Sequence, residues 1–422
     1  MEELVTRRAD AGRRRSMREA QRHLRANRMH GVKAFVLTPK EIPGSIGPAK
    51  LRQNQAMTII ITDEDVKRLL PMRDCIEAMR VAFGDLANGA AVNRPRVRYL
   101  AKHPDPERKY LANVHVGAVP SYGIACVRAG SQVIRPPSAA NDRRLYENPQ
   151  AFNWGIVILY SIETAEPLAL MHEFGLSGMR VGATTAVAVD QIARADAATL
   201  GLFGTGKQAR CSLEAIQLVR PIRRVNVYSP SAAHRAVFAH DMGGDGIDVV
   251  AVDDAHKVVA GADIVCCATT AMRPVFDGNS LEEGQVVVSI ANSDVTNKRS
   301  EVDRRTYERA TIVVVNDWES VIENDQTELL DPIKDGVVRR EQVHELGDII
   351  LGKVRVSQSR RQRHRAGIVY YKNNSGLAIQ FAAAGGIVYH KALAEGSNKT
   401  FPTEWLGSNL SSYYQAGFRP SP

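Results

Sequence analysis

One short segment restricts the possible folds of this chain more than any other. Residues 199–203 form a short apolar run that suits a buried strand, and the turn 204–209, Gly-Thr-Gly-Lys-Gln-Ala, follows directly and leads into a helical pattern. Gly204 permits a tight turn, Gly206 lets the backbone approach a pyrophosphate, and the small Ala209 lets the helix pack on the strand. The segment predicts dinucleotide binding, with the cofactor contacted by Gly204, Thr205, Gly206, Lys207 and Gln208.

The chain beyond this turn alternates between apolar runs and helical patterns. The runs lie at residues 224–228, 248–250, 264–268, 286–291 and 311–315. Strands separated by helices of this length predict a parallel, doubly wound sheet. We therefore expect an α/β fold with a Rossmann-like NAD(P)-binding domain over residues 180–370. Its first helix is expected over Ala183–Ala193.

The end of the second predicted strand bears on the choice of cofactor. NAD-binding proteins usually place an acidic residue there to bind the adenosine ribose. Here the chain continues as Ser229, Pro230 and Ser231, with His234 and Arg235 just beyond. Hydroxyl and basic groups suit a 2′-phosphate, so the sequence favours NADP over NAD, with Ser229 and Ser231 as contacts.

Residues 57–179 have a different pattern. After a strand at 58–61, Thr62 or Asp63 is suited to cap a helix with an acidic first turn, and later runs predict a mostly antiparallel sheet. This part reads as a second, α+β domain. Residues 1–56 read as a basic, disordered extension and residues 397–422 as a loosely attached C-terminal tail.

The net charge lies almost entirely in the N-terminal extension. Residues 1–56 hold 13 Lys+Arg and 5 Asp+Glu, which is +8 of the total of +9. The remainder is nearly neutral, whereas a nucleic-acid-binding domain is expected to carry a basic face, so we expect no nucleic-acid partner. The extension has three alternative interpretations: a disordered segment, an Arg-rich targeting sequence, or residues before a working start at Met57.

The number and spacing of the cysteines and the hydropathy of the chain bear on metal binding, location and membrane association. The five cysteines form no CxxC pair and have no ligand-like spacing, so we expect no metal and a reducing, cytoplasmic location. No apolar run approaches the roughly 18 residues that span a bilayer, so we expect no membrane association.

Five short motifs together resemble the ornithine cyclodeaminase/μ-crystallin family over about residues 57–396. They occur in the family's order, at residues 61–66, 179–185, 204–209, 345–348 and 375–380. The resemblance implies a homodimer, with the sheet of a substrate-binding domain (57–179, joined by 371–396) at the interface. It also implies hydride transfer at the α-carbon of an amino acid or imine, as in ornithine cyclodeaminases, ketimine reductases, and alanine or opine-type dehydrogenases.

The resemblance assigns roles to particular residues. Arg180, expected just before a helix N-terminus, matches the arginine that holds the substrate carboxylate. Arg96 matches a second carboxylate-binding arginine, although Arg94 and Arg98 would share its face of a strand. The family positions that face the cofactor correspond to Thr184 together with Thr185, and to Ala268 and Thr269.

The chain also departs from the family pattern. The family's catalytic lysine is missing, and Arg128 is the nearest cation, although arginine stays protonated at neutral pH. Asp294, with Asn292 as the alternative, corresponds to the acidic residue that acts on the substrate amine. Phe381 stands where the family often has an aspartate.

These departures weaken the assignment to ornithine. We expect either cyclodeamination of ornithine to proline and ammonia, or a ketimine reductase or amino-acid dehydrogenase. The alternative of another class is a non-catalytic NADPH-binding protein, as in the crystallin branch of the family.

Overall fold

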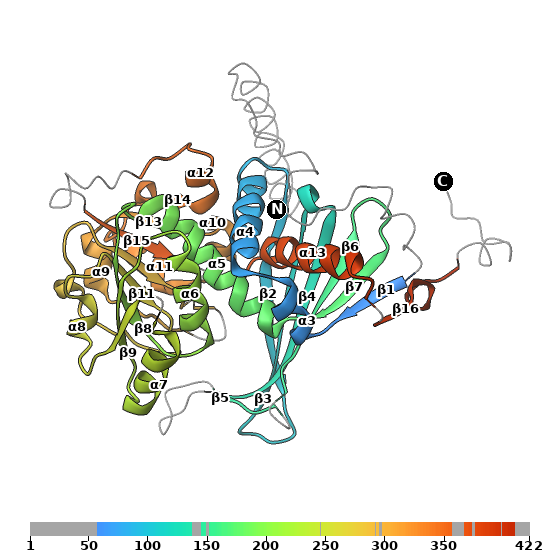
Figure 1. Ribbon diagram of the computed structural model, residues 1–422, viewed down its shortest axis with the longest axis horizontal. Coiled ribbons are helices and arrows are strands. Elements are labelled where there is room, and N and C mark those ends of the chain that lie inside the picture. The colour runs from blue at the N-terminus through green and yellow to red at the C-terminus, as the bar shows by residue number, and fades with distance from the viewer. Residues whose placement is uncertain are drawn as a thin grey trace, which may run out of the picture. The chain divides into compact units, whose positions relative to one another are not determined.

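Two eight-stranded sheets organise the part of the chain that the computed structural model describes (Figure 1). The described residues are 57–136, 145–148, 152–244, 246–291, 293–294, 298–356, 367–373, 376–397 and 399–409. The expectations for residues 1–56 and for Asn292 therefore lie outside the described residues.

The first sheet has the order β16-β1-β7-β6-β4-β3-β2, with β5 paired to β4. Its strands are β1 (Met57–Ile61), β2 (Val92–Lys102), β3 (Lys109–Val119), β4 (Ile124–Arg135), β5 (Leu145–Tyr146), β6 (Trp154–Ser161), β7 (Pro167–His172) and β16 (Thr400–Pro402). Every pairing is antiparallel except β1 with β7. The prediction of a mostly antiparallel sheet is confirmed.

Strand β16 corrects one expectation about the C-terminal tail. Residues Thr400–Pro402 pair with the edge strand β1, and the hydroxyls of Thr58 and Thr403 lie 3.1 Å apart. This part of the tail is attached to the sheet because β1 otherwise presents unpaired backbone groups at its edge.

Helices cover one face of the first sheet. Helix α13 (Ala378–Ala394) packs across β3, β4 and β6 (Figure 1), while α3 (Asp63–Leu69) and α4 (Met72–Ala87) flank it. Thr62 caps α3 in a capping box with Asp65. Of the two predicted caps, Thr62 and Asp63, the first is therefore correct. The opposite face of the sheet remains exposed and apolar.

Helix α5 (Phe174–Ile192) begins nine residues before the predicted start at Ala183. Its glycines serve close packing: a side chain at Gly182 would collide with the backbone of Cys211 on the neighbouring helix. Tertiary contact overrides the weak helix propensity of glycine here. Arg180 consequently lies inside the helix and not before its N-terminus.

The second sheet has the order β10-β9-β8-β11-β12-β15-β13-β14, and all of its pairings are parallel. Its strands are β8 (Thr199–Phe203), β9 (Arg224–Tyr228), β10 (Asp248–Ala251), β11 (Ile264–Cys267), β12 (Val286–Ser289), β13 (Ala310–Val315), β14 (Val343–Glu345) and β15 (Ile368–Lys372). The connecting helices are α6 (Lys207–Gln217), α7 (Ala232–Met242), α8 (His256–Val259), α9 (Arg304–Arg309), α10 (Trp318–Glu323), α11 (Thr327–Lys334) and α12 (Leu346–Ile350). The predicted fold class is confirmed.

This sheet reverses its strand order beside β8. Strand β9 pairs with one edge of β8 and β11 with the other, so the glycine turn after β8 lies at the point where parallel α/β sheets bind their ligands. Within the described residues, no helix has the length and apolar character required to cross a membrane.

Candidate active site

The glycine turn leaves a helix N-terminus open for an anion. Gly204 has a φ of +104°, and its amide donates to the carbonyl of Tyr228 at 2.8 Å. Gly206 is the N-cap of α6 and supplies no side-chain cap, and the space where its side chain would stand is empty. The side chain of Gln208 has a buried Oε1 without a partner among the described residues. These features fit the pyrophosphate of a dinucleotide.

Lys207, predicted at the same turn, points toward the start of α5. Its Nζ donates to the carbonyl of Phe174 at 2.9 Å and lies 3.3 Å from the centre of that ring. Burial lowers the pKa of Lys207. The side chain thus ties the turn to α5, while its role toward a cofactor stays a prediction.

The end of β9 carries a guanidinium and two hydroxyls. Arg235 lies over the ring of Tyr228, and its Nη1 donates to the carbonyl of Ser229 at 2.5 Å. Ser231 caps α7 by accepting from the amide of His234 at 3.2 Å. The arrangement presents a cation and a helix N-terminus on one side of the expected ribose site.

A buried carboxylate that sequence reasoning missed holds the loop after β11. Glu301 accepts from the amide and hydroxyl of Thr269, both at 2.7 Å, through one oxygen. Its other oxygen accepts from Ser289 Oγ at 2.8 Å and from two backbone amides after β12. The carboxylate therefore fixes Thr269 and Ala268 against the end of β12, beside the glycine turn.

Arg180 is fixed by a side chain from α13. Its Nη1 donates to Gln380 Oε1 at 2.9 Å, and the amide of Gln380 in turn donates to Thr184 Oγ1 at 2.7 Å. Thr184 is fully buried and donates to the carbonyl of Arg180 at 2.7 Å. Thr184 is thus part of the support for Arg180, and its predicted contact with a cofactor stays a prediction.

No carboxylate of the described residues pairs with Arg180. Its Nε is buried without a partner, and its guanidinium lies 5.0 Å from the centre of the Phe381 ring. Burial lowers the pKa of Arg180 to about 10, so it stays charged at neutral pH. A fixed guanidinium that lacks a carboxylate partner is suited to bind one from a ligand.

The structure separates the three arginines that strand spacing left equivalent. The pairing of β2 with β3 shifts by one residue between Arg94 and Val97, which turns Arg94 to the exposed face. Both Arg96 Nη2, at 3.1 Å, and Arg98 Nη1 donate to one oxygen of Asp294. Burial lowers the pKa of Arg96 to about 9. The two predicted residues Arg96 and Asp294 therefore form an ion pair, which Arg98 shares.

Arg128 reaches the same face of the sheet from β4. Its Nη2 pairs with Glu173 at 2.8 Å, and Nη1 donates to Asn113 on β3. Glu173 is 3% exposed, and despite its burial the neighbouring Arg128 lowers its pKa. Arg96, Arg98, Arg128 and Arg180 lie close enough to act on one another electrostatically, and we call these four residues the arginine cluster. Sequence reasoning did not include Glu173.

A second buried ion pair supports the loop that carries Asp294. Lys372, which is fully buried, donates to Glu328 and, at 3.1 Å, to the carbonyl of Ala291. Glu328 also accepts from the amide of Ser293 at 2.6 Å. Sequence reasoning did not include this pair, and the only local signal for it was a lysine at the end of the apolar strand β15.

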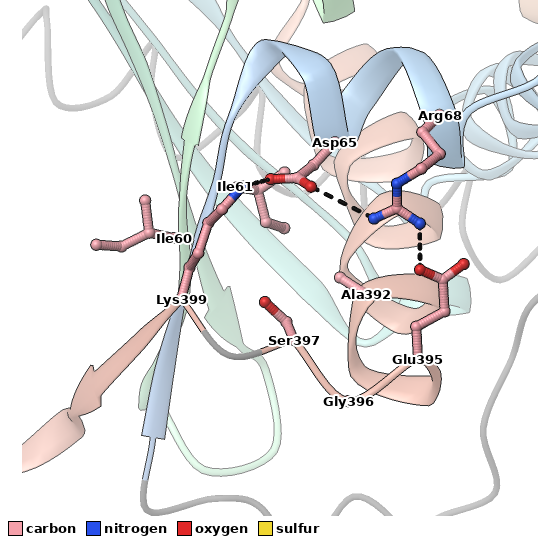
Figure 2. Close-up of a pocket in the computed structure, with 9 residues that line it drawn as sticks. All are labelled: Ile60, Ile61, Asp65, Arg68, Ala392, Glu395, Gly396, Ser397 and Lys399. Atoms are coloured by element: carbon pink, nitrogen blue, oxygen red, sulfur yellow. Dashed lines mark hydrogen bonds and ion pairs between the residues drawn. The ribbon is translucent and has the colours of Figure 1, made fainter.

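A pocket elsewhere on the chain has no part in this cluster. Figure 2 shows it between β1, α3 and the end of α13, lined in part by Asp65, Arg68, Glu395 and Lys399. These four charges pair with one another, as the dashed lines mark. The described residues also contain no cluster of metal-ligating side chains.

The doubly wound sheet with its uncapped glycine turn has the features of the dinucleotide-binding class of proteins, and the buried arginine cluster is suited to bind a small carboxylate. Within that class, residues 56–396 match the ornithine cyclodeaminase/mu-crystallin family, and the chain belongs to it.

Several relatives of this chain are enzymes. It is 32% identical over 244 residues to a Δ1-pyrroline-2-carboxylate reductase of Bacillus cereus, which covers 57% of this chain and 72% of the relative. It is 28% identical over 341 residues to an alanine dehydrogenase of Archaeoglobus fulgidus, and this match covers 80% of this chain and 96% of the relative. The structure of Thermococcus litoralis Δ1-pyrroline-2-carboxylate reductase in complex with NADH and L-proline is 27% identical with a TM-score of 0.68, covering 80% and 98%. The predicted family and the prediction of an NAD(P)-dependent enzyme are confirmed.

Proposed function

We propose that the protein is an NAD(P)H-dependent reductase of α-imino acids that also runs in reverse as an amino-acid dehydrogenase. The observation that carries this proposal is Arg180, fixed by Gln380 and without a carboxylate partner among the described residues. The similarity to pyrroline-2-carboxylate reductases and to alanine dehydrogenase supports the same reaction class.

The residues divide the work of binding and orientation. Arg180 and Arg96 bind the substrate carboxylate, and Arg128 adds positive charge beside it. Asp294 forms ion pairs with the guanidiniums of Arg96 and Arg98. It orients the substrate nitrogen by accepting a hydrogen bond from it. A bound nicotinamide cofactor would supply the hydride to the α-carbon of the protonated imine, or accept it from the amino acid in the reverse direction.

The chain's own residues fit this cofactor. The amides of the α6 N-terminus would hold its pyrophosphate, since no side chain caps them. Thr269, held by Glu301, would border the nicotinamide. Ser229, Ser231 and Arg235 would surround the ribose, and the guanidinium at this position favours NADP.

The substrate side chain is uncharged or acidic in this proposal. Phe381 stands where a carboxylate would be needed to bind a distal ammonium group, and the guanidiniums of both Arg128 and Arg180 lie within 5.7 Å of its ring centre. A second cation placed there would be repelled. Cyclic imino acids and alanine-like substrates therefore fit better than ornithine or lysine.

We also propose that two copies associate through the exposed face of the first sheet. This face carries apolar side chains, including Val97 at 62%, Tyr99 at 51%, Trp154 at 54% and Ile156 at 47% exposed. Such a contiguous apolar surface is typical of a protein interface. Light scattering after size-exclusion chromatography tests this association.

The five cysteines are all free, which supports a reducing compartment such as the cytoplasm.

A spectrophotometric screen tests the proposed function. Nicotinamide absorbance is followed with NADPH and NADH while Δ1-pyrroline-2-carboxylate or pyruvate with ammonia is supplied. Ornithine and lysine are supplied with NADP+ and NAD+ instead, because their oxidation requires the oxidised cofactor, and the release of ammonia is measured as well. We expect oxidation of the cofactor with the imino acids and little turnover of the basic amino acids. Cofactor binding without turnover of any substrate would instead identify a non-catalytic binding protein.

A further inference from the structure

A histidine outside the predicted site lies at the centre of the arginine cluster. His115 is on β3, directly opposite Arg128 on β4, and is 4% exposed. Neither of its ring nitrogens has a hydrogen-bond partner among the residues that the structure describes. A buried polar group without a partner costs stability, so an unpaired imidazole at such a position points to a missing ligand.

The surroundings keep this imidazole neutral. Arg96 and Arg98 from β2, Arg128 from β4 and Arg180 from α5 all act on it, and the ring packs 5.7 Å from that of Phe381 on α13. Burial and these positive charges hold the pKa of His115 well below its ordinary value. A neutral imidazole donates a hydrogen bond through one nitrogen and accepts through the other.

The glycine before α13 keeps His115 and Arg180 open to the same point. A side chain at Gly376 would place its Cβ 3.0 Å from Arg180 Nη2 and 3.1 Å from His115 Nε2. Any residue other than glycine would therefore cover both nitrogens. The two nitrogens converge where a single ligand group can reach them.

We propose that His115 Nε2 and Arg180 Nη2 bind the same substrate carboxylate, with Gly376 keeping its approach free. His115 thereby contacts the substrate and adds a directional hydrogen bond without a further charge in a site that already holds four guanidiniums. The inference rests on the proposed function for the carboxylate nature of the substrate.

Binding of pyrrole-2-carboxylate, a planar and unreactive carboxylate probe, tests this subsite in the full chain. Calorimetry compares the wild type with His115→Leu. The matched control is His390→Leu, because His390 on α13 is also buried, at 7% exposed, and its Nδ1 has no partner among the described residues. We expect His115→Leu to weaken the probe about tenfold or more, since hydrogen bonds to charged groups are among the stronger ones. His390→Leu should bind the probe as the wild type does, and both variants should keep the wild-type affinity for NADPH.

Gly376→Ala provides a second variant that leaves both donors in place. Its methyl group would cover them, so we expect a loss of probe affinity comparable to that of His115→Leu. Unchanged probe binding in both variants, while Arg180→Gln loses it, would overturn the inference and leave the proposed function intact. If both variants lose affinity for the probe while the wild-type protein reduces no imino acid, the result would support the subsite and refute the proposed function.

Discussion

Replacing Arg180 by lysine keeps the positive charge but removes the planar fork that the structure places for a carboxylate. The wild-type guanidinium is held by Gln380 at 2.9 Å and stays charged, with a pKa of about 10. A lysine ammonium is a point charge without a planar fork, so it cannot present two parallel N–H donors to the two oxygens of a carboxylate. Loss of a charge-assisted contact in a desolvated site costs about 2–5 kcal/mol, or roughly 30-fold to several thousand-fold.

The loss should appear in kcat/KM for imino acids, measured by absorbance at a saturating cofactor concentration. The affinity for NADPH, measured by fluorescence, should change little because Arg180 is part of the arginine cluster and not of the glycine turn. The matched control is Arg220→Lys. Arg220 is 7% exposed and donates to carbonyls at the C-terminal end of α5, the helix that carries Arg180. This variant should therefore lose stability and keep catalysis.

Two outcomes would refute this reasoning. An Arg180→Lys variant with intact kcat/KM would show that the guanidinium does not hold the carboxylate. A variant that loses NADPH binding together with activity would place Arg180 in the cofactor site.

Three further perturbations follow from the contacts described above. Ser229→Asp should shift preference toward NADH, because a carboxylate repels a 2′-phosphate; titration of both cofactors by fluorescence checks this. Glu301→Gln should lower stability by about 1–3 kcal/mol and weaken cofactor binding, since Thr269 loses its charged acceptor; chemical denaturation and cofactor titration measure both effects. His172 has a raised pKa because its bonds to the Asn153 carbonyl and to Asp63 outweigh burial, so it should stabilise the protein fully below about pH 6.5 and lose that contribution as the pH rises through its folded-state pKa. A melting curve of His172→Asn that kept the wild-type pH dependence would contradict this last expectation.

The parts of this molecule that could be predicted are those that local sequence determines. The strand, glycine turn and helix around residues 199–217 are contiguous, and each residue type has a direct conformational reason. The parallel sheet follows from the repetition of such units. Thr62 could be proposed as a cap because a capping box spans only four residues.

The parts that could not be predicted depend on contacts between distant segments. The shift that separates Arg94 from Arg96 arises in the pairing of β2 with β3, and Pro95 was its local signal, since proline in a strand often marks a bulge. The early start of α5 depends on how closely α6 packs against it. His115 has the pattern of an ordinary strand residue, and only the assembled cluster shows that its nitrogens lack partners.

Transfer of deuterium from a reduced cofactor that carries two deuterium atoms at C4 of the nicotinamide tests the central claim most directly. The full chain is incubated with the deuterated reduced cofactor and Δ1-pyrroline-2-carboxylate, and the amino-acid product is examined by mass spectrometry and nuclear magnetic resonance. The account predicts one deuterium on the α-carbon of the product. Cofactor that remains bound and unoxidised, or product without deuterium at that carbon, would contradict it.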